Sequence, residues 1–167
     1  MRGSTLPRMT TLALVISVLF AGAYAAQQLD HQHDEMSRRG DAVMGFSHEK
    51  TTHHFRLRAN GGEIEVTAND ARDSQSVESI RGHLRHVAQM FRDGNFTAPI
   101  LIHAQNPPGV AVMAARKGEI EYTVESLSAG ARIRIVTKDV EALDAVHAFL
   151  RFQITDHRTG HPLTIQQ

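Results

Sequence analysis

The chain has 167 residues, with 18 basic and 18 acidic side chains, 11 histidines and no cysteine. The lack of cysteine excludes disulfides, thiolate metal sites and a cysteine nucleophile. The neutral charge balance gives no electrostatic footprint for nucleic acid or an anionic lipid surface, so we expect no nucleic-acid partner.

The first 25 residues have the pattern of a secretory signal peptide. Arg2 and Arg8 make a basic start, residues 11–20 are apolar, and residues 23–25 (AYA) suit a signal peptidase. The alternative is an uncleaved membrane anchor, but a bilayer span needs about 20 apolar residues and this segment is shorter. We therefore expect cleavage after Ala25 and export to the periplasm or the medium, with no membrane attachment of the mature chain.

Residues 26–50 show no sustained hydrophobic period, and we expect a mobile N-terminal arm whose end, residues 43–46, docks on the domain. His31 and His33 lie in this arm among acidic residues. They are interpreted either as a flexible metal-capture tail or, in preference, as part of a solvated linker. Residues 51–167 are long enough for a single domain with its own core.

Residues 52–68 predict a β-hairpin, because apolar and polar residues alternate on both sides of Asn60-Gly61. A two-residue turn at these positions places Arg58 opposite Glu63. One face of the hairpin is then apolar. The other pairs arginines with glutamates, which we interpret as structural ion pairs.

The same alternation separates two neighbouring histidines. Successive side chains of a strand point to opposite faces. His53 therefore shares the core side with Phe55, whereas His54 points the other way beside Arg56.

A helix is expected over residues 74–92, with Asp73 or Ser74 as N-cap and Gly94 at its end. His83, His86 and Met90 fall on one flank of it, because spacings of three and four residues place side chains on adjoining turns. Its apolar stripe consists of Val77, Ile80, Leu84, Val87 and Phe91.

The middle of the chain is less regular. Residues 100–102 are a short apolar run whose structure, strand or helix, the pattern leaves open. Residues 107–109 (PPG) predict a rigid bend, and a short helix is expected over residues 110–116.

Residues 118–139 repeat the hairpin pattern, and a helix is expected over residues 140–158, capped by Asp139 and ended by Gly160. The chain therefore contains a pseudo-repeat in which a hairpin is followed by a helix. Two such units predict an α+β fold, a two-layer sandwich of one four-stranded antiparallel sheet with both helices on one face.

The histidines suggest a metal site. His83 and His86 share a helix flank that we expect to cross the first hairpin near His53, and His103 follows as a fourth candidate. Imidazole suits both zinc and copper, and thioether suits Cu(I). The alternative gives each histidine a separate structural role with its own hydrogen-bond partner.

Other residues of the last helix have structural interpretations. His147 is expected to be a core histidine, and His157 to favour the helix C-terminus. Phe149 and Phe152 lie off the stripe of this helix that is expected to face the sheet, and so they add apolar side chains beyond that stripe. They indicate contact with the first helix, with the arm, or with a second copy or other protein partner.

Three stretches, "MGFSHEKTTHHF", "QNPPGVAVM" and "FLRFQITDHRTGH", resemble a group of small exported bacterial proteins with no assigned activity. The resemblance covers most of the chain after residue 25. It implies an exported location and adds no mechanism.

The sequence thus favours an exported domain that binds copper or a divalent metal such as zinc in the periplasm through His53, His83, His86 and His103. The alternative is a non-catalytic interaction or scaffold domain without metal. A metal-dependent enzyme would need a substrate pocket as well, and the sequence contains no nucleophile motif, HExxH or phosphate loop.

Overall fold

The computed structural model describes residues 27–28, 30–31 and 33–167. The expected signal peptide, residues 1–25, lies outside the described residues. The chain divides into two compact units, residues 1–35 and 36–167. No helix in the described part of the chain is long and apolar enough to cross a membrane.

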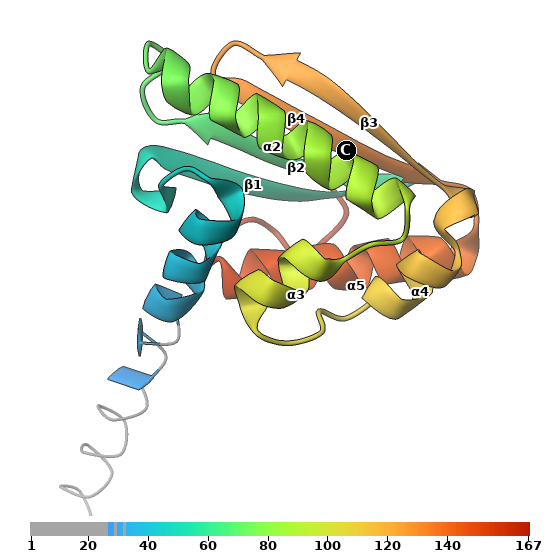
Figure 1. Ribbon diagram of the computed structural model, residues 1–167. Helices are drawn as coiled ribbons and strands as arrows, with labels where there is room; N and C mark the ends of the chain where they lie inside the picture. Colours follow the sequence, from blue (N-terminus) through green and yellow to red (C-terminus); the bar gives the residue numbers. More distant parts are fainter. Residues whose placement is uncertain (1–26, 29, 32) are drawn as a thin grey trace, which may run out of the picture. The chain divides into compact units, whose positions relative to one another are not determined.

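The described residues of the first unit are helical, and His31 lies 3.6 Å from Glu35 one turn later. The second unit carries all the other elements. It begins with helical residues 36–44, and its later elements are shown in Figure 1. These are η1 (His48–Lys50), β1 (Thr51–Arg58), β2 (Gly61–Ala68), α2 (Ser74–Arg92), α3 (Thr97–His103), α4 (Val110–Ala115), η2 (Lys117–Glu119), β3 (Ile120–Leu127), β4 (Gly130–Thr137) and α5 (Val140–Asp156).

The four strands form one open antiparallel sheet in the order β1-β2-β4-β3. The predicted α+β architecture and the repeated hairpin–helix unit are therefore confirmed. Each long helix packs mainly on the hairpin of the other hairpin–helix repeat, not on the hairpin that precedes it. α2 lies on β3 and β4, whereas α5 lies on β1 and β2 (Figure 1). α2 also contacts β2, and its His83 lines the same cavity as His53 of β1, as expected for the flank of the first helix.

The register of the first hairpin differs from the prediction by two residues. Ala59 and Asn60 form the turn, so that Arg58 pairs with Gly61 and Arg56 with Glu63. Gly61 lies in β2 and pairs with Val136 of β4. Only glycine fits there, because a Cβ would lie 2.0 Å from the carbonyl oxygen of Ile135 in β4. A shift of two residues keeps every side chain on its expected face.

The second hairpin and both long helices agree with the prediction. Val124 pairs with Ile133 and Glu125 with Arg132. The side chain of Asp73 caps α2, and that of Asp139 caps α5, each by accepting a hydrogen bond from a backbone N–H of the first turn.

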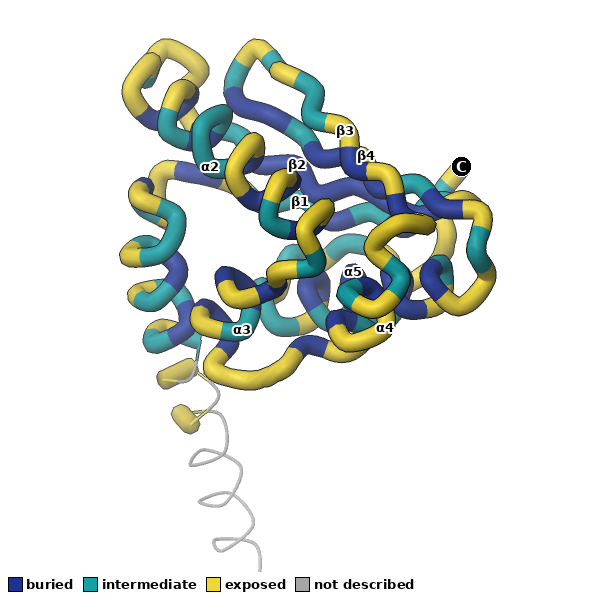
Figure 2. The backbone as a smooth tube through the Cα atoms, turned by 45° about the vertical axis from the view of Figure 1, so that its right-hand side comes forward, coloured by how far each residue is buried: buried dark blue, intermediate teal, exposed yellow. Residues whose placement is uncertain are grey.

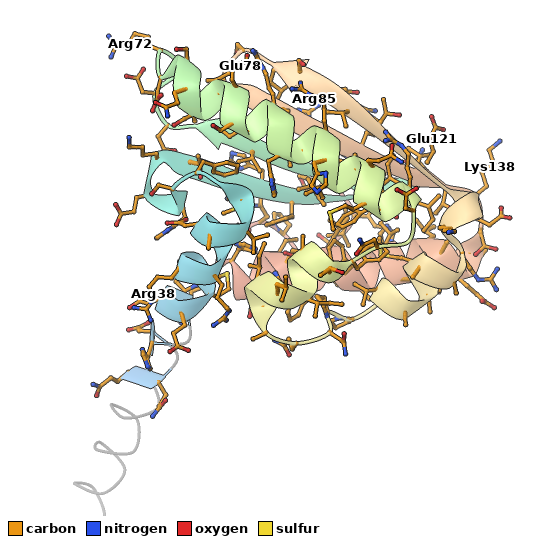
Figure 3. The ribbon with its side chains drawn as sticks, in the orientation of Figure 1. Arg38, Arg72, Glu78, Arg85, Glu121 and Lys138 are labelled. Atoms are coloured by element: carbon orange, nitrogen blue, oxygen red, sulfur yellow. The ribbon has the colours of Figure 1, made fainter. Side chains whose placement is uncertain are left out.

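The core lies between the sheet and the helices, and the buried residues of the helices lie on the sides that face it (Figure 2). Charged residues such as Glu78 and Arg85 are on the outer side of α2 (Figure 3). Phe46 is buried in the core and Met44 packs against it, so the end of the expected arm does dock.

Phe149 does not form surface, because it is 1% exposed and its ring packs edge-on against Phe91 of α2 at 5.9 Å. Of the expected contacts, the structure therefore shows the one with the first helix. Phe152 is half-buried and packs against His103.

The segment after α5 runs along β1, the edge strand. The backbone N–H of Gln166 donates to the carbonyl of Leu57, and Arg58 donates to the carbonyl of Gln167. Arg151 of α5 holds the same segment through the carbonyl of Leu163. These contacts cover part of an otherwise open sheet edge.

Candidate metal-binding cavity

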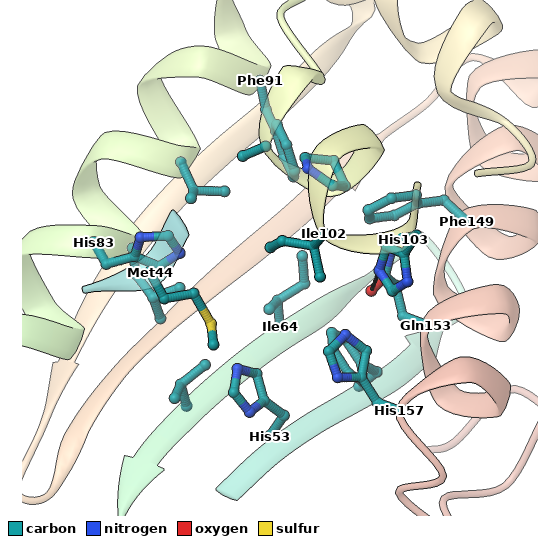
Figure 4. A pocket seen from close by; sticks show the side chains of 16 residues that line it. Met44, His53, Ile64, His83, Phe91, Ile102, His103, Phe149, Gln153 and His157 are labelled. Atoms are coloured by element: carbon teal, nitrogen blue, oxygen red, sulfur yellow. Dashed lines mark hydrogen bonds between the residues drawn. The ribbon is translucent and has the colours of Figure 1, made fainter. Parts of the chain in front are cut away.

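A cavity of about 70 Å³ lies on the helix-covered side of the first hairpin. It has room for a few water molecules or one small ligand. Its walls are largely apolar, with histidines at the margin (Figure 4). The apolar walls include Phe55, Ile64, Val66, Leu84, Val87, Phe91, Ile102 and Phe149.

Three of the four predicted metal ligands line this cavity, namely His53, His83 and His103. His86 does not line it and is exposed on α2. The prediction placed His83 and His86 together by their spacing, but only the first of them faces the cavity. A further histidine, His157, lines the cavity as well.

His53 reaches the cavity from β1, as the alternation of the strand predicts. Its ring lies almost parallel to that of His157, with centroids 5.3 Å apart. Burial, with a smaller effect of the neighbouring His83, lowers the pKa of His53 to about 4. His53 is therefore neutral at pH 7, which is the form of imidazole that binds metals.

His83 enters from α2 on the other side of the cavity. The ring of Phe46 packs against it edge to face at 5.5 Å. Burial lowers the pKa of His83 to about 4, with a further contribution from His86. Both imidazoles thus offer a lone pair at neutral pH.

His103 lies at the end of α3, and both of its ring nitrogens have partners. Nδ1 is 2.5 Å from a carboxylate oxygen of Asp156, and Nε2 is 3.0 Å from the side-chain oxygen of Gln153. With these bonds in place, neither nitrogen is open to a metal. His103 therefore forms part of the wall and joins α3 to α5.

His157, the C-cap of α5, was interpreted from the sequence only as a residue that favours a helix C-terminus. In the structure its ring contacts those of His53, Phe55 and His103. Its spacing of four residues from Gln153 could have placed both on one helix flank. Nothing in the sequence, however, shows that this flank meets β1.

Met44 also lines the cavity and supplies a thioether sulfur. It ends the helical segment of residues 36–44, which Arg39 holds to α3 by a hydrogen bond to the carbonyl of Ile102. Figure 4 shows the thioether of Met44 between the rings of His83 and His53. Within the described residues no three histidine or carboxylate side chains are grouped to hold a metal.

His147 has the structural role that the sequence predicts. It is buried in α5, and its Nε2 lies 2.9 Å from the carbonyl oxygen of Arg58 and 3.0 Å from that of Gly61. One N–H shared between these carbonyls fastens α5 to the turn of the first hairpin.

Fold and cavity together define a class: a small α+β domain with neutral histidines and a thioether around an apolar cavity. No protein-family model, no curated protein and no solved structure matches the chain. The resemblance to small exported bacterial proteins therefore stays a prediction.

Proposed function

We propose that this protein is an exported copper-binding domain that holds Cu(I) in the cavity through His53, His83 and Met44. The observation that carries the proposal is the approach of two neutral imidazoles and one thioether to a single apolar cavity. Thioether is a soft ligand that selects Cu(I), and imidazole suits copper.

The charge of the cavity favours a monovalent ion. No carboxylate is among the described residues that line it. The nearby Asp41 already pairs with His48, at 3.0 Å. Burying a divalent ion without an anionic ligand costs much more free energy than burying a monovalent one. We therefore favour Cu(I) over zinc.

The two other histidines predicted as ligands have different roles in this proposal. His86 stays in solvent, and His103 keeps its bonds to Asp156 and Gln153. The alternative of a metal-free interaction domain rested on surplus apolar surface at Phe149 and Phe152. It loses the support of Phe149, which is buried.

The test is an anaerobic Cu(I) titration of untagged protein against a chromophoric Cu(I) chelator. We expect one tight equivalent. His53→Ala, His83→Ala and Met44→Leu should each weaken it at least tenfold. Met44→Leu matters most, because it keeps the apolar volume and removes only the sulfur.

His86→Ala is the matched control, because it removes an imidazole from the same helix without touching the cavity. Its Cu(I) affinity should equal that of the wild type. The proposal is wrong if wild-type protein binds no Cu(I), or if His86→Ala weakens binding as much as His83→Ala. Circular dichroism of each variant shows that a loss of binding is not a loss of fold.

A further inference from the structure

A second pair of histidines lies on the side of the sheet away from the cavity. His54 follows His53 in β1 and therefore points to the opposite face. There it meets His161, which belongs to the segment after α5. The pair joins parts of the chain that are 107 residues apart.

The two rings are placed like a metal chelate. Nδ1 of His54 and Nε2 of His161 are 3.1 Å apart, and the rings are nearly perpendicular. Two nitrogens that each lie about 2.0–2.1 Å from one metal are separated by about 3 Å at tetrahedral or square angles. A metal could therefore replace the hydrogen bond between the rings if each ring rotates so that its lone pair points at the ion, while the two nitrogens keep their distance.

The charged groups beside the pair are bonded to one another. Glu65 is directly opposite His54 in the register, and its carboxylate accepts hydrogen bonds from Arg56 and Arg132. Burial, with His54 and Arg56 nearby, lowers the pKa of His161, while Glu65 raises it. The pair is partly exposed, which leaves room for water as further ligands.

We propose that His54 and His161 form a second metal site, for a divalent ion that prefers imidazole, and that Cu(II) is the ion bound most tightly. The bound ion ties the C-terminal segment to β1. It adds to the backbone bond from Gln166 to Leu57 and so closes the sheet edge more firmly. This site is independent of the Cu(I) cavity.

The first experiment is a Cu(II) titration in air, with glycine as competing ligand, of untagged protein carrying His31→Ala and His33→Ala. These two changes remove the histidines of the N-terminal segment, which would bind Cu(II) by themselves. We expect His54→Ala and His161→Ala each to weaken Cu(II) at least tenfold. His53→Ala should leave the Cu(II) affinity unchanged although it weakens Cu(I) binding at least tenfold.

The variants at the adjacent positions 53 and 54 should therefore have opposite effects, since His53→Ala affects only Cu(I) binding and His54→Ala affects only Cu(II) binding. Cu(II) affinity that is equal in the parent protein, His54→Ala and His161→Ala overturns the second site and leaves the cavity proposal untouched. If Cu(II) binding is lost only in His53→Ala, the ion binds in the cavity, and the proposal of a second site is again overturned. Failure of the cavity proposal would instead appear only in the anaerobic titration.

Hydrogen exchange of the Gln166 amide reports on the C-terminal segment. Cu(II) should slow this exchange at least threefold in the parent protein and leave it unchanged in His161→Ala. Equal exchange with and without Cu(II) in the parent protein would mean that no metal ties this segment to β1.

Discussion

The side chains of β1 have opposite environments on the two faces of the sheet. On the covered face β1 contributes Phe55 and Leu57 to the core and His53 to an apolar cavity. On the open face it contributes Arg56 and Arg58 to ion pairs and His54 to a contact with His161. One step along the chain therefore separates two environments.

The environments differ in how they handle charge. Under the helices, burial is the largest influence on the histidines and keeps them neutral. On the open face charges are kept and paired. Burial works to raise the pKa of Glu65, but hydrogen bonds from Arg132 and Arg56 outweigh it and leave the pKa lowered. Burial thus dominates for these two histidines, whereas bonds to arginines dominate for Glu65.

The sharpest contrast is between the neighbours Ile133 and Arg132 of β4. Ile133 is 0% exposed on the covered face. Ile133→Ala should lower the free energy of unfolding by about 2–5 kcal/mol, through lost burial and a cavity. Urea unfolding measures this loss, and Arg132→Ala should lower the free energy of unfolding by less than Ile133→Ala does. An equal or larger loss in Arg132→Ala would mean that the open face contributes as much as the core.

Acid should weaken the covered face before the open one in metal-free protein. His53 and His83 titrate near 6.5 when unfolded and at about 4 when folded, so the unfolded chain binds more protons in between. The free energy of unfolding should therefore fall as the pH drops from 6.5 to about 4. The fall is at most about 3 kcal/mol per histidine, and less because both residues stay partly exposed.

Urea unfolding at several pH values, for the wild type and for His53→Gln/His83→Gln, separates this effect from that of other groups. The double variant should depend less on pH between 6.5 and 4. An identical slope in both proteins would show that these two histidines are not held neutral by the fold.

On the open face Glu65→Gln should cost about 1–2 kcal/mol, since the bonds of a charged acceptor to Arg132 and Arg56 become weaker. The folded pKa of Glu65 is lowered, so its contribution is present above pH 4.5 and is lost below it. Glu121→Gln, at an exposed position of β3 (Figure 3), is the control and should change stability by less than about 0.5 kcal/mol. A cost that is equal at pH 7 and pH 3 would contradict the assignment.

The smallest effect is expected at the margin of the open face. Arg134 is 48% exposed and bonds to Glu125 at 3.1 Å. Arg134→Ala should lower the free energy of unfolding by less than about 1 kcal/mol, because solvent screens exposed ion pairs. Urea unfolding in low and high salt checks this, and a loss above 2 kcal/mol would show that the ion pairs act as one cooperative network.

Local patterns predicted most of the elements because they depend on near neighbours. The alternation around residues 60–61 predicted the hairpin and the faces of His53 and His54. It did not predict the register, because the position of Gly61 depends on its close packing against the carbonyl of Ile135 in another strand. The run at residues 100–102 is helical within α3, an outcome that the pattern alone left open.

The candidate site was only partly predictable for the same reason. Helical spacing placed His83 and His86 on one flank. Whether either reaches β1 depends on how α2 packs, and only His83 lines the cavity. Met44 and His157 carried no signal for it, because their approach is set by elements distant in the sequence.

The sequence by itself determined the fold class, the helix caps and the opposite directions of His53 and His54, since each follows from periodicity or from hydrogen bonds within a few residues. Only the tertiary structure decided which helix covers which hairpin, that Met44 lies with His53 and His83, and that His161 meets His54. Those contacts join segments far apart in the chain, and their geometry comes from packing that no local pattern records.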